Sequence, residues 1–136
     1  AQLDTALDLT AAGDIMSTTY TPIRSDSKIL IDIRLRARED TGNNATWYVG
    51  LKKTIGGVNS YPGGQYMMHC QSKDDNNQWG GYYQMVVDSA GGSSEITYTL
   101  IAGPWGSANG TSFNVNKAAA DGELGGAQLI IYEVSG

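Results

Sequence analysis

Few residues of this chain could carry out chemistry. His69 is the only histidine and Cys70 the only cysteine. Together they suggest a thiol nucleophile with its base, but neighbouring residues of a strand point to opposite faces and cannot activate one another. We interpret Cys70 as a small core residue and His69 as a surface or intersubunit residue. A single histidine excludes a histidine-rich zinc site within one chain, and only three copies meeting on a three-fold axis would change that. We predict no metal ion.

Carboxylates are the other candidates for catalysis, as the acid and base of a glycosidase. Asp74 and Asp75 lie in an asparagine-rich segment, whereas Asp121 and Glu123 lie beside glycines. Asp and Asn in such segments bond to their own backbone, so we interpret both segments as solvated turns. Neither has EF-hand spacing, and no serine-hydrolase, phosphate-loop or zinc motif occurs. We therefore predict no catalytic residue and no cofactor; a carboxylate pair assembled between subunits is the remaining alternative.

Two tryptophans are better candidates for binding. Trp79 follows Asn76, Asn77 and Gln78 in a polar segment, and Trp105 lies in a Gly-Pro-Trp-Gly segment. Aromatic rings stack on the apolar face of a pyranose while nearby amides bond to its hydroxyls. We predict that these five residues form glycan-binding loops. The alternative is that both rings fold back over one end of the fold.

Composition limits the class of protein. The chain of 136 residues fits one domain, predicted to span residues 1–136. Its formal net charge of −5 argues against a nucleic-acid partner, because neutralising phosphates requires clustered Lys and Arg. One cysteine allows no internal disulfide. No run approaches the roughly 18–20 apolar residues of a membrane span, so we expect no membrane insertion.

Alternation of apolar and polar residues predicts strands along most of the chain. In residues 28–38, Ile29, Ile31, Ile33 and Leu35 alternate with mostly charged residues, so one face is expected in a core. The same alternation appears in the runs Trp47–Leu51, Tyr66–Cys70, Tyr83–Val87 and Ile96–Leu100. Gly, Asn and Asp clusters between the runs supply tight turns. About eight or nine antiparallel strands at this spacing predict an all-β fold, a single jelly-roll-like β-sandwich.

The last predicted strand is apolar on both faces. Leu129 and Ile131 point one way, whereas Ile130, Tyr132 and Val134 point the other. A strand with one solvated face would carry polar residues on that face. One face is therefore expected to fill the core, and the other lies either under a loop or against a neighbouring subunit.

The order of the elements resembles the C-terminal module of bacteriophage tail and head fibres. That pattern has a Thr/Tyr-rich strand, a V-N/Y-I-N-R/K strand, an Asp-rich turn and a terminal S-T-I-T-A-M-E-I/V strand. Here Glu95–Ile101, Asn114–Lys117 and Leu129–Val134 occupy the strand positions. Residues 17–31, S-T-T-Y-T-P-I-R-S-D-S-K-I-L-I, are similar to the family's S-V-S-I-T-P-x-S-T-S-S-K-I-L-V. The segment from about Thr54 to Gly81 has no counterpart in the pattern.

The resemblance implies a trimeric head, similar to tumour-necrosis-factor-like and C1q-like heads, that is part of the virion and has no enzymatic activity. It implies that Ile130, Tyr132 and Val134 form an oligomer interface near a three-fold axis. The implied partners are two further copies of the chain, other virion proteins and a glycan of the host cell surface. Two alternatives stay open: a capsid decoration or head-fibre knob bound to the shell, and a free, monomeric carbohydrate-binding module.

Overall fold

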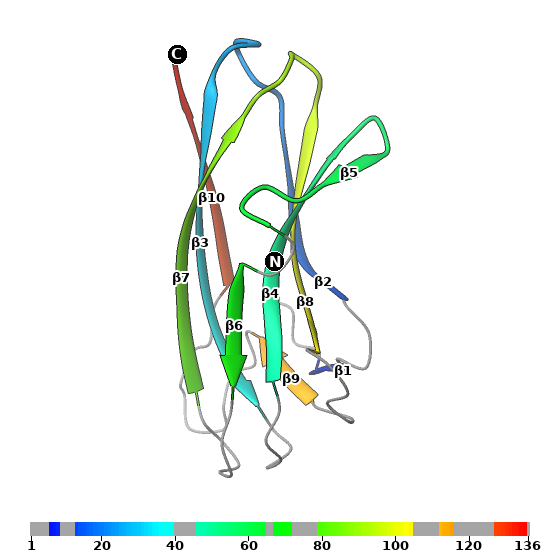
Figure 1. Cartoon of the computed structure of the whole chain (residues 1–136), viewed down its shortest axis with the longest axis vertical. Coiled ribbons are helices and arrows are strands. Elements are labelled where there is room, and N and C mark those ends of the chain that lie inside the picture. Colours follow the sequence, from blue (N-terminus) through cyan, green and yellow to red (C-terminus); the bar gives the residue numbers. More distant parts are fainter. Residues whose placement is uncertain are drawn as a thin grey trace.

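The computed structural model describes residues 6–8, 13–39, 46–64, 67–71, 79–104, 112–115 and 127–135. These residues form ten β-strands and no helix, which confirms the prediction of an all-β fold (Figure 1). The strands are β1 (Ala6–Asp8), β2 (Gly13–Tyr20), β3 (Lys28–Glu39), β4 (Thr46–Ile55), β5 (Val58–Ser60), β6 (Met68–Gln71), β7 (Trp79–Ser89), β8 (Ile96–Pro104), β9 (Ser112–Val115) and β10 (Ala127–Val134).

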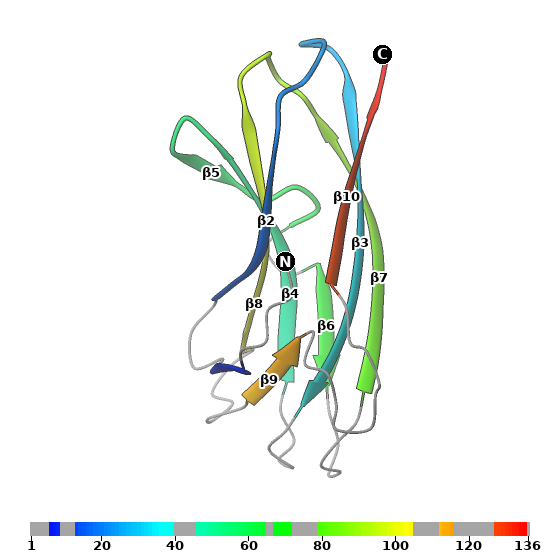
Figure 2. The ribbon, with the colours of Figure 1, turned by 180° about the vertical axis from the view of Figure 1, so that it is seen from behind.

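The strands form two antiparallel sheets. In sheet A, β3 is central, with β7 on one side and both β10 and β9 on the other, and β1 pairs with β9. Sheet B has the order β2-β8-β4, and β5 and β6 both pair with β4. The views in Figures 1 and 2 show the long strands of both sheets running along the long axis of the molecule.

The strand order is that of a jelly roll. Val115 of β9 pairs with Ala37, and Ala127 of β10 pairs with Leu35, so β9 and β10 are two segments along the same side of β3. We count β5 as part of the β4 hairpin and β9 with β10 as one strand. Positions 1–4 are then β1–β4, positions 5–7 are β6–β8, and position 8 is β9 with β10. In these numbers the strand order is 1-8-3-6 in sheet A and 2-7-4-5 in sheet B. The predicted jelly-roll-like sandwich is therefore confirmed, with ten strand segments where about eight or nine were expected.

The core lies between the two sheets and is made by their inward rows. The alternating residues Ile29, Ile31, Ile33 and Leu35 of β3 are buried, as predicted. Full burial of one such side chain contributes roughly 1.5–3 kcal/mol, so this strand is a main source of stability. The facing residues of sheet B are Ile15, Val49, Leu51, Ile96, Tyr98, Leu100 and Ala102.

Strand β7 turns its predicted apolar row outward. Tyr83, Met85 and Val87 alternate as a core row would, yet their side chains are exposed. The register explains this, because Val86 pairs directly with Ile31, and directly paired residues share a face. Since Ile31 is buried in the core, Val86 must be as well. The inward row of β7 is therefore Tyr82, Gln84, Val86 and Asp88.

Candidate functional site

The outer face of sheet A carries apolar side chains on three adjacent strands. Direct partners in the register share a face, so the pairings of β3 with β10 and β7 define its rows. Each row has one residue from β10, one from β3 and one from β7, in that order. From one end to the other the rows are Val134/Lys28/Ser89, Tyr132/Leu30/Val87, Ile130/Asp32/Met85 and Gln128/Arg34/Tyr83. We call the apolar residues of these rows the sheet A patch: Leu30, Tyr83, Met85, Val87, Ile130, Tyr132 and Val134.

The sheet A patch holds most of the exposed large hydrophobic side chains of the described residues, five of eight. Val87 and Tyr83 are the most exposed members, at 63% and 62%. Three strands about 4.8 Å apart and four rows about 7 Å apart give this outer face an area of roughly 400 Å², and seven of its twelve residues are apolar. Exposed apolar side chains gathered on one face of a folded domain are typical of an interaction surface.

The residues predicted for an oligomer interface all belong to this patch. Tyr132 and Val134 are exposed and Ile130 is half-buried, whereas Leu129 and Ile131 pack against the core. The predicted division of the last strand into an inner and an outer apolar face is therefore confirmed. That the outer face meets another subunit stays a prediction.

Sequence reasoning missed the β7 half of the surface. The signal was present in the alternation of Tyr83, Met85 and Val87, but alternation does not say which face is inward. Only the pairing with β3 assigns it. The patch is consequently wider than the single strand predicted to form the interface.

One carboxylate is buried within the patch. Asp32 is 2% exposed and lies between Ile130 and Met85 in the register. Its Oδ2 accepts hydrogen bonds from Arg34, at 2.8 Å from Nη2 and 3.2 Å from Nε, and from the Tyr83 hydroxyl at 3.4 Å. The Arg34 guanidinium also lies over the Tyr83 ring, 5.3 Å from its centroid. These contacts compensate the desolvation of the carboxylate.

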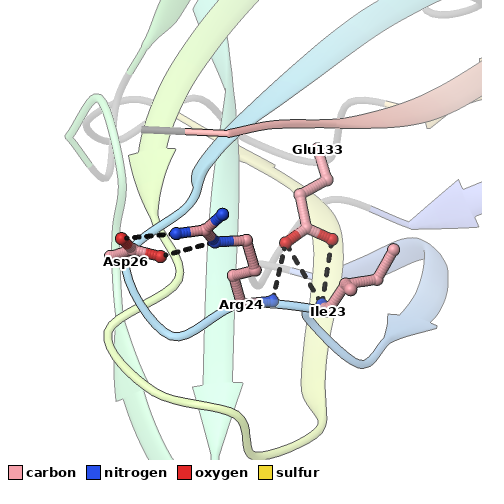
Figure 3. Close-up of polar contacts among 4 residues, drawn as sticks. All are labelled: Ile23, Arg24, Asp26 and Glu133. Carbon is pink, nitrogen blue, oxygen red and sulfur yellow. Dashed lines mark hydrogen bonds and ion pairs between the residues drawn. The ribbon is translucent and has the colours of Figure 1, made fainter.

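A second polar arrangement ties the end of β10 to the turn between β2 and β3 (Figure 3). The Glu133 carboxylate accepts hydrogen bonds from the backbone N–H groups of Ile23, at 3.0 and 3.1 Å, and of Arg24, at 3.0 Å. The Tyr20 hydroxyl donates to the same carboxylate. We call this arrangement the Glu133 clasp. The Arg24 guanidinium faces away from it, to Asp26 at 3.2 Å.

The clasp shifts the pKa values of its members. The Ser27 hydroxyl, the Tyr20 hydroxyl and the Ile23 amide lower the pKa of Glu133 to about 2. Ser27 is buried and its hydroxyl acts on the carboxylate without the geometry of a complete hydrogen bond. The contact with Glu133 raises the pKa of Tyr20 to about 12. Because the carboxylate is already bonded within the chain, we interpret the clasp as structural.

Of the five predicted glycan-binding residues, only Trp79 lies within the described part of the chain. Asn76, Asn77, Gln78 and Trp105 lie outside the described residues. Trp79 is the first residue of β7 and pairs with Arg38, so its predicted position inside a loop is wrong. Binding of a glycan by these residues stays a prediction.

Of the candidate catalytic residues, the two in β6 are within the described part of the chain and the four carboxylates are not. Asp74, Asp75, Asp121 and Glu123 lie outside the described residues. His69 and Cys70 lie in β6, paired with Tyr48 and Trp47, and their interpretation stays a prediction because their side chains are not described.

The described part of the chain contains no group of three or more His, Cys, Asp or Glu side chains able to hold a metal ion. In the same ranges no helix is long and apolar enough to cross a membrane. Comparison of the chain with protein-family models, curated proteins and solved structures found no match.

Proposed function

We propose that this protein is a noncatalytic structural module of a bacteriophage virion, the head of a fibre that attaches to the host cell surface. The observation that carries the proposal is the sheet A patch, seven apolar residues grouped on an outer face of roughly 400 Å². The jelly-roll strand order and the resemblance of residues 17–31 and 95–134 to fibre modules support the same assignment.

The patch favours self-association into a homotrimer. A closed cyclic assembly removes apolar surface from water without leaving a growing edge. Seven of the twelve residues in the four outward rows are apolar, so roughly 230 Å² of apolar surface would be buried, which contributes about 6 kcal/mol before the cost of association is subtracted. A standard interface buries about 800 Å² per partner, so residues flanking the four rows must supply about half of the contact.

In this proposal the host-surface glycan is bound at the end of the sandwich at which β7 begins. Trp79 pairs with Arg38, whereas Val134 pairs with Lys28, ten residues earlier on β3. At about 3.3 Å per residue the two ends lie roughly 33 Å apart. Glycan contact near Trp79 would thus take place far from Val134 at the end of β10. The host-surface glycan and the other virion proteins can therefore be bound at opposite ends.

The proposal is tested by the mass of the assembly and by where the protein sits. Multi-angle light scattering of the purified chain is expected to give three times the mass of one chain. Antibody labelling of intact particles under the electron microscope is expected to mark fibre tips. Labels spread over the shell would assign the protein to capsid decoration instead, and a stable monomer that binds a glycan would assign it to a free carbohydrate-binding module.

A further inference from the structure

Two charged residues lie among apolar side chains at one end of the sheet A patch. They are Asp32 and Arg34, and both contact Tyr83. Asp32 is the only acidic residue in the four outward rows, and it is buried. Its partners are open to water: the Arg34 side chain is 48% exposed and Tyr83 is 62% exposed. The ion pair is thus half-buried in a single chain and would become fully buried if the patch were covered.

Covering such an ion pair does not by itself favour binding. The desolvation of two charges costs about as much as their attraction returns, and apolar residues of similar volume often associate more tightly. An ion pair within an apolar surface has a different consequence. Docked arrangements that leave Arg34 or Asp32 buried without a partner are strongly disfavoured, whereas arrangements that only shift apolar side chains are not.

We propose that the cluster of Asp32, Arg34 and Tyr83 determines the register and the number of copies in the assembly, while the apolar patch supplies its affinity. This inference rests on the proposed self-association. Arg34 is suited to the role because its planar guanidinium bonds to Asp32 through two nitrogens and stacks on Tyr83, which fixes its orientation. A flat apolar face without such a group would dock in several registers.

The charge of the face identifies a second copy of the chain as its occupant. Lys28, Asp32 and Arg34 give the outward rows a formal charge of +1, whereas the whole chain carries −5. The excess negative charge therefore lies elsewhere, and this face is where two acidic copies repel each other least. An anionic membrane or a nucleic acid would meet repulsion from the rest of the molecule.

The test replaces the ion pair by apolar side chains of similar size. The variant Asp32→Leu/Arg34→Met is compared with the wild type by native mass spectrometry and sedimentation velocity. We expect the wild type to form one species, and the double variant to stay associated but to populate at least two stoichiometries. Arg34→Met alone leaves Asp32 unpaired and should weaken association by about tenfold or more. Arg24→Met, which breaks the exposed ion pair with Asp26 outside the sheet A face, is the matched control and should leave one species.

The outcomes separate this inference from the proposed function. A wild-type trimer together with a double variant that is an equally uniform trimer overturns the inference and leaves the proposed function intact. A wild-type monomer overturns both. Should the double variant not fold in a thermal melt, Arg34→Lys decides, since it keeps the charge but loses the planar two-nitrogen contact. Mixed stoichiometry of Arg34→Lys supports the inference, and a uniform trimer overturns it.

Discussion

Tyr98 of sheet B donates a hydrogen bond to Asp88 of sheet A, 2.7 Å from its hydroxyl oxygen to Oδ2. The tyrosine is fully buried, and Lys53 Nζ lies 2.7 Å from the same carboxylate oxygen. Burial and the contact with Asp88 raise the pKa of Tyr98. These contacts allow β7 to turn Asp88 inward, and the same register turns Met85 and Val87 outward. The polar contact inside the sandwich and the apolar patch outside it therefore depend on one another.

Removal of Asp88 should destabilise the fold strongly. The side chains of Lys53 and Asp88 are 10% and 15% exposed, so Asp88→Ala leaves a nearly buried ammonium without a carboxylate and bonded only to the Ser89 carbonyl, at 2.7 Å. We expect a loss of about 3 kcal/mol in the free energy of unfolding, measured by urea titration. The double variant Asp88→Ala/Lys53→Met should recover most of it. Asp26→Ala, which breaks an exposed pair with Arg24, is the control and should change stability by about 0.5 kcal/mol or less. Equal losses in the two single variants would contradict the inter-sheet role.

Much of the fold could be predicted because the alternation of β3 and the two apolar faces of β10 are local properties of the sequence. The inward row of β7 could not, because burying Asp88 is tolerable only with Lys53 and Tyr98, which come from other strands. The Glu133 clasp escaped prediction for a related reason. Its donors include the backbone amides of a turn more than a hundred residues earlier, and no sequence pattern marks backbone amides as partners.

The clasp should make stability depend on pH at both extremes. Glu133 has a pKa of about 2 in the folded chain against an ordinary value of 4.5, so its contribution is complete above pH 4.5 and is lost as the pH falls towards 2. Tyr20 has a pKa of about 12 against 10, so its contribution is complete below pH 10 and is lost as the pH rises towards 12. The melting temperatures of the wild type and Glu133→Gln should differ most between pH 4.5 and pH 10. They should converge below about pH 2. A difference in melting temperature that stays constant from pH 7 to pH 2 would show that the charge of Glu133 is unimportant.

A charge placed in the sheet A patch should separate the subunits without unfolding them. Val87 is 63% exposed in the single chain, so Val87→Asp costs little in the monomer but buries an unpaired carboxylate in the assembly. We expect the trimer to dissociate to a folded monomer, with a loss of about 2 kcal/mol or more per contact. Light scattering reports the mass, and circular dichroism reports the fold. Thr19→Asp introduces the same charge at an exposed position of β2, in sheet B, and should remain trimeric. Dissociation of both variants would mean that net charge, and not the patch, controls assembly.

Attachment to the host should depend on the end of the sandwich at which Trp79 begins β7. The backbone of Trp79 pairs with Arg38 at the far end of β3, so substitution of the side chain leaves the described rows of the patch in place. We expect Trp79→Ala to keep the trimer and its melting temperature, but to weaken binding to polysaccharide-bearing cells. Loss of an aromatic anchor typically costs about 2 kcal/mol per site, and three sites per trimer multiply the loss through avidity. Tyr61→Ala, which removes an exposed ring from the segment after β5, is the matched control and should attach normally. Attachment of Trp79→Ala equal to that of the wild type would place the glycan site elsewhere, whereas a collapsed melting temperature would make Trp79 part of the fold.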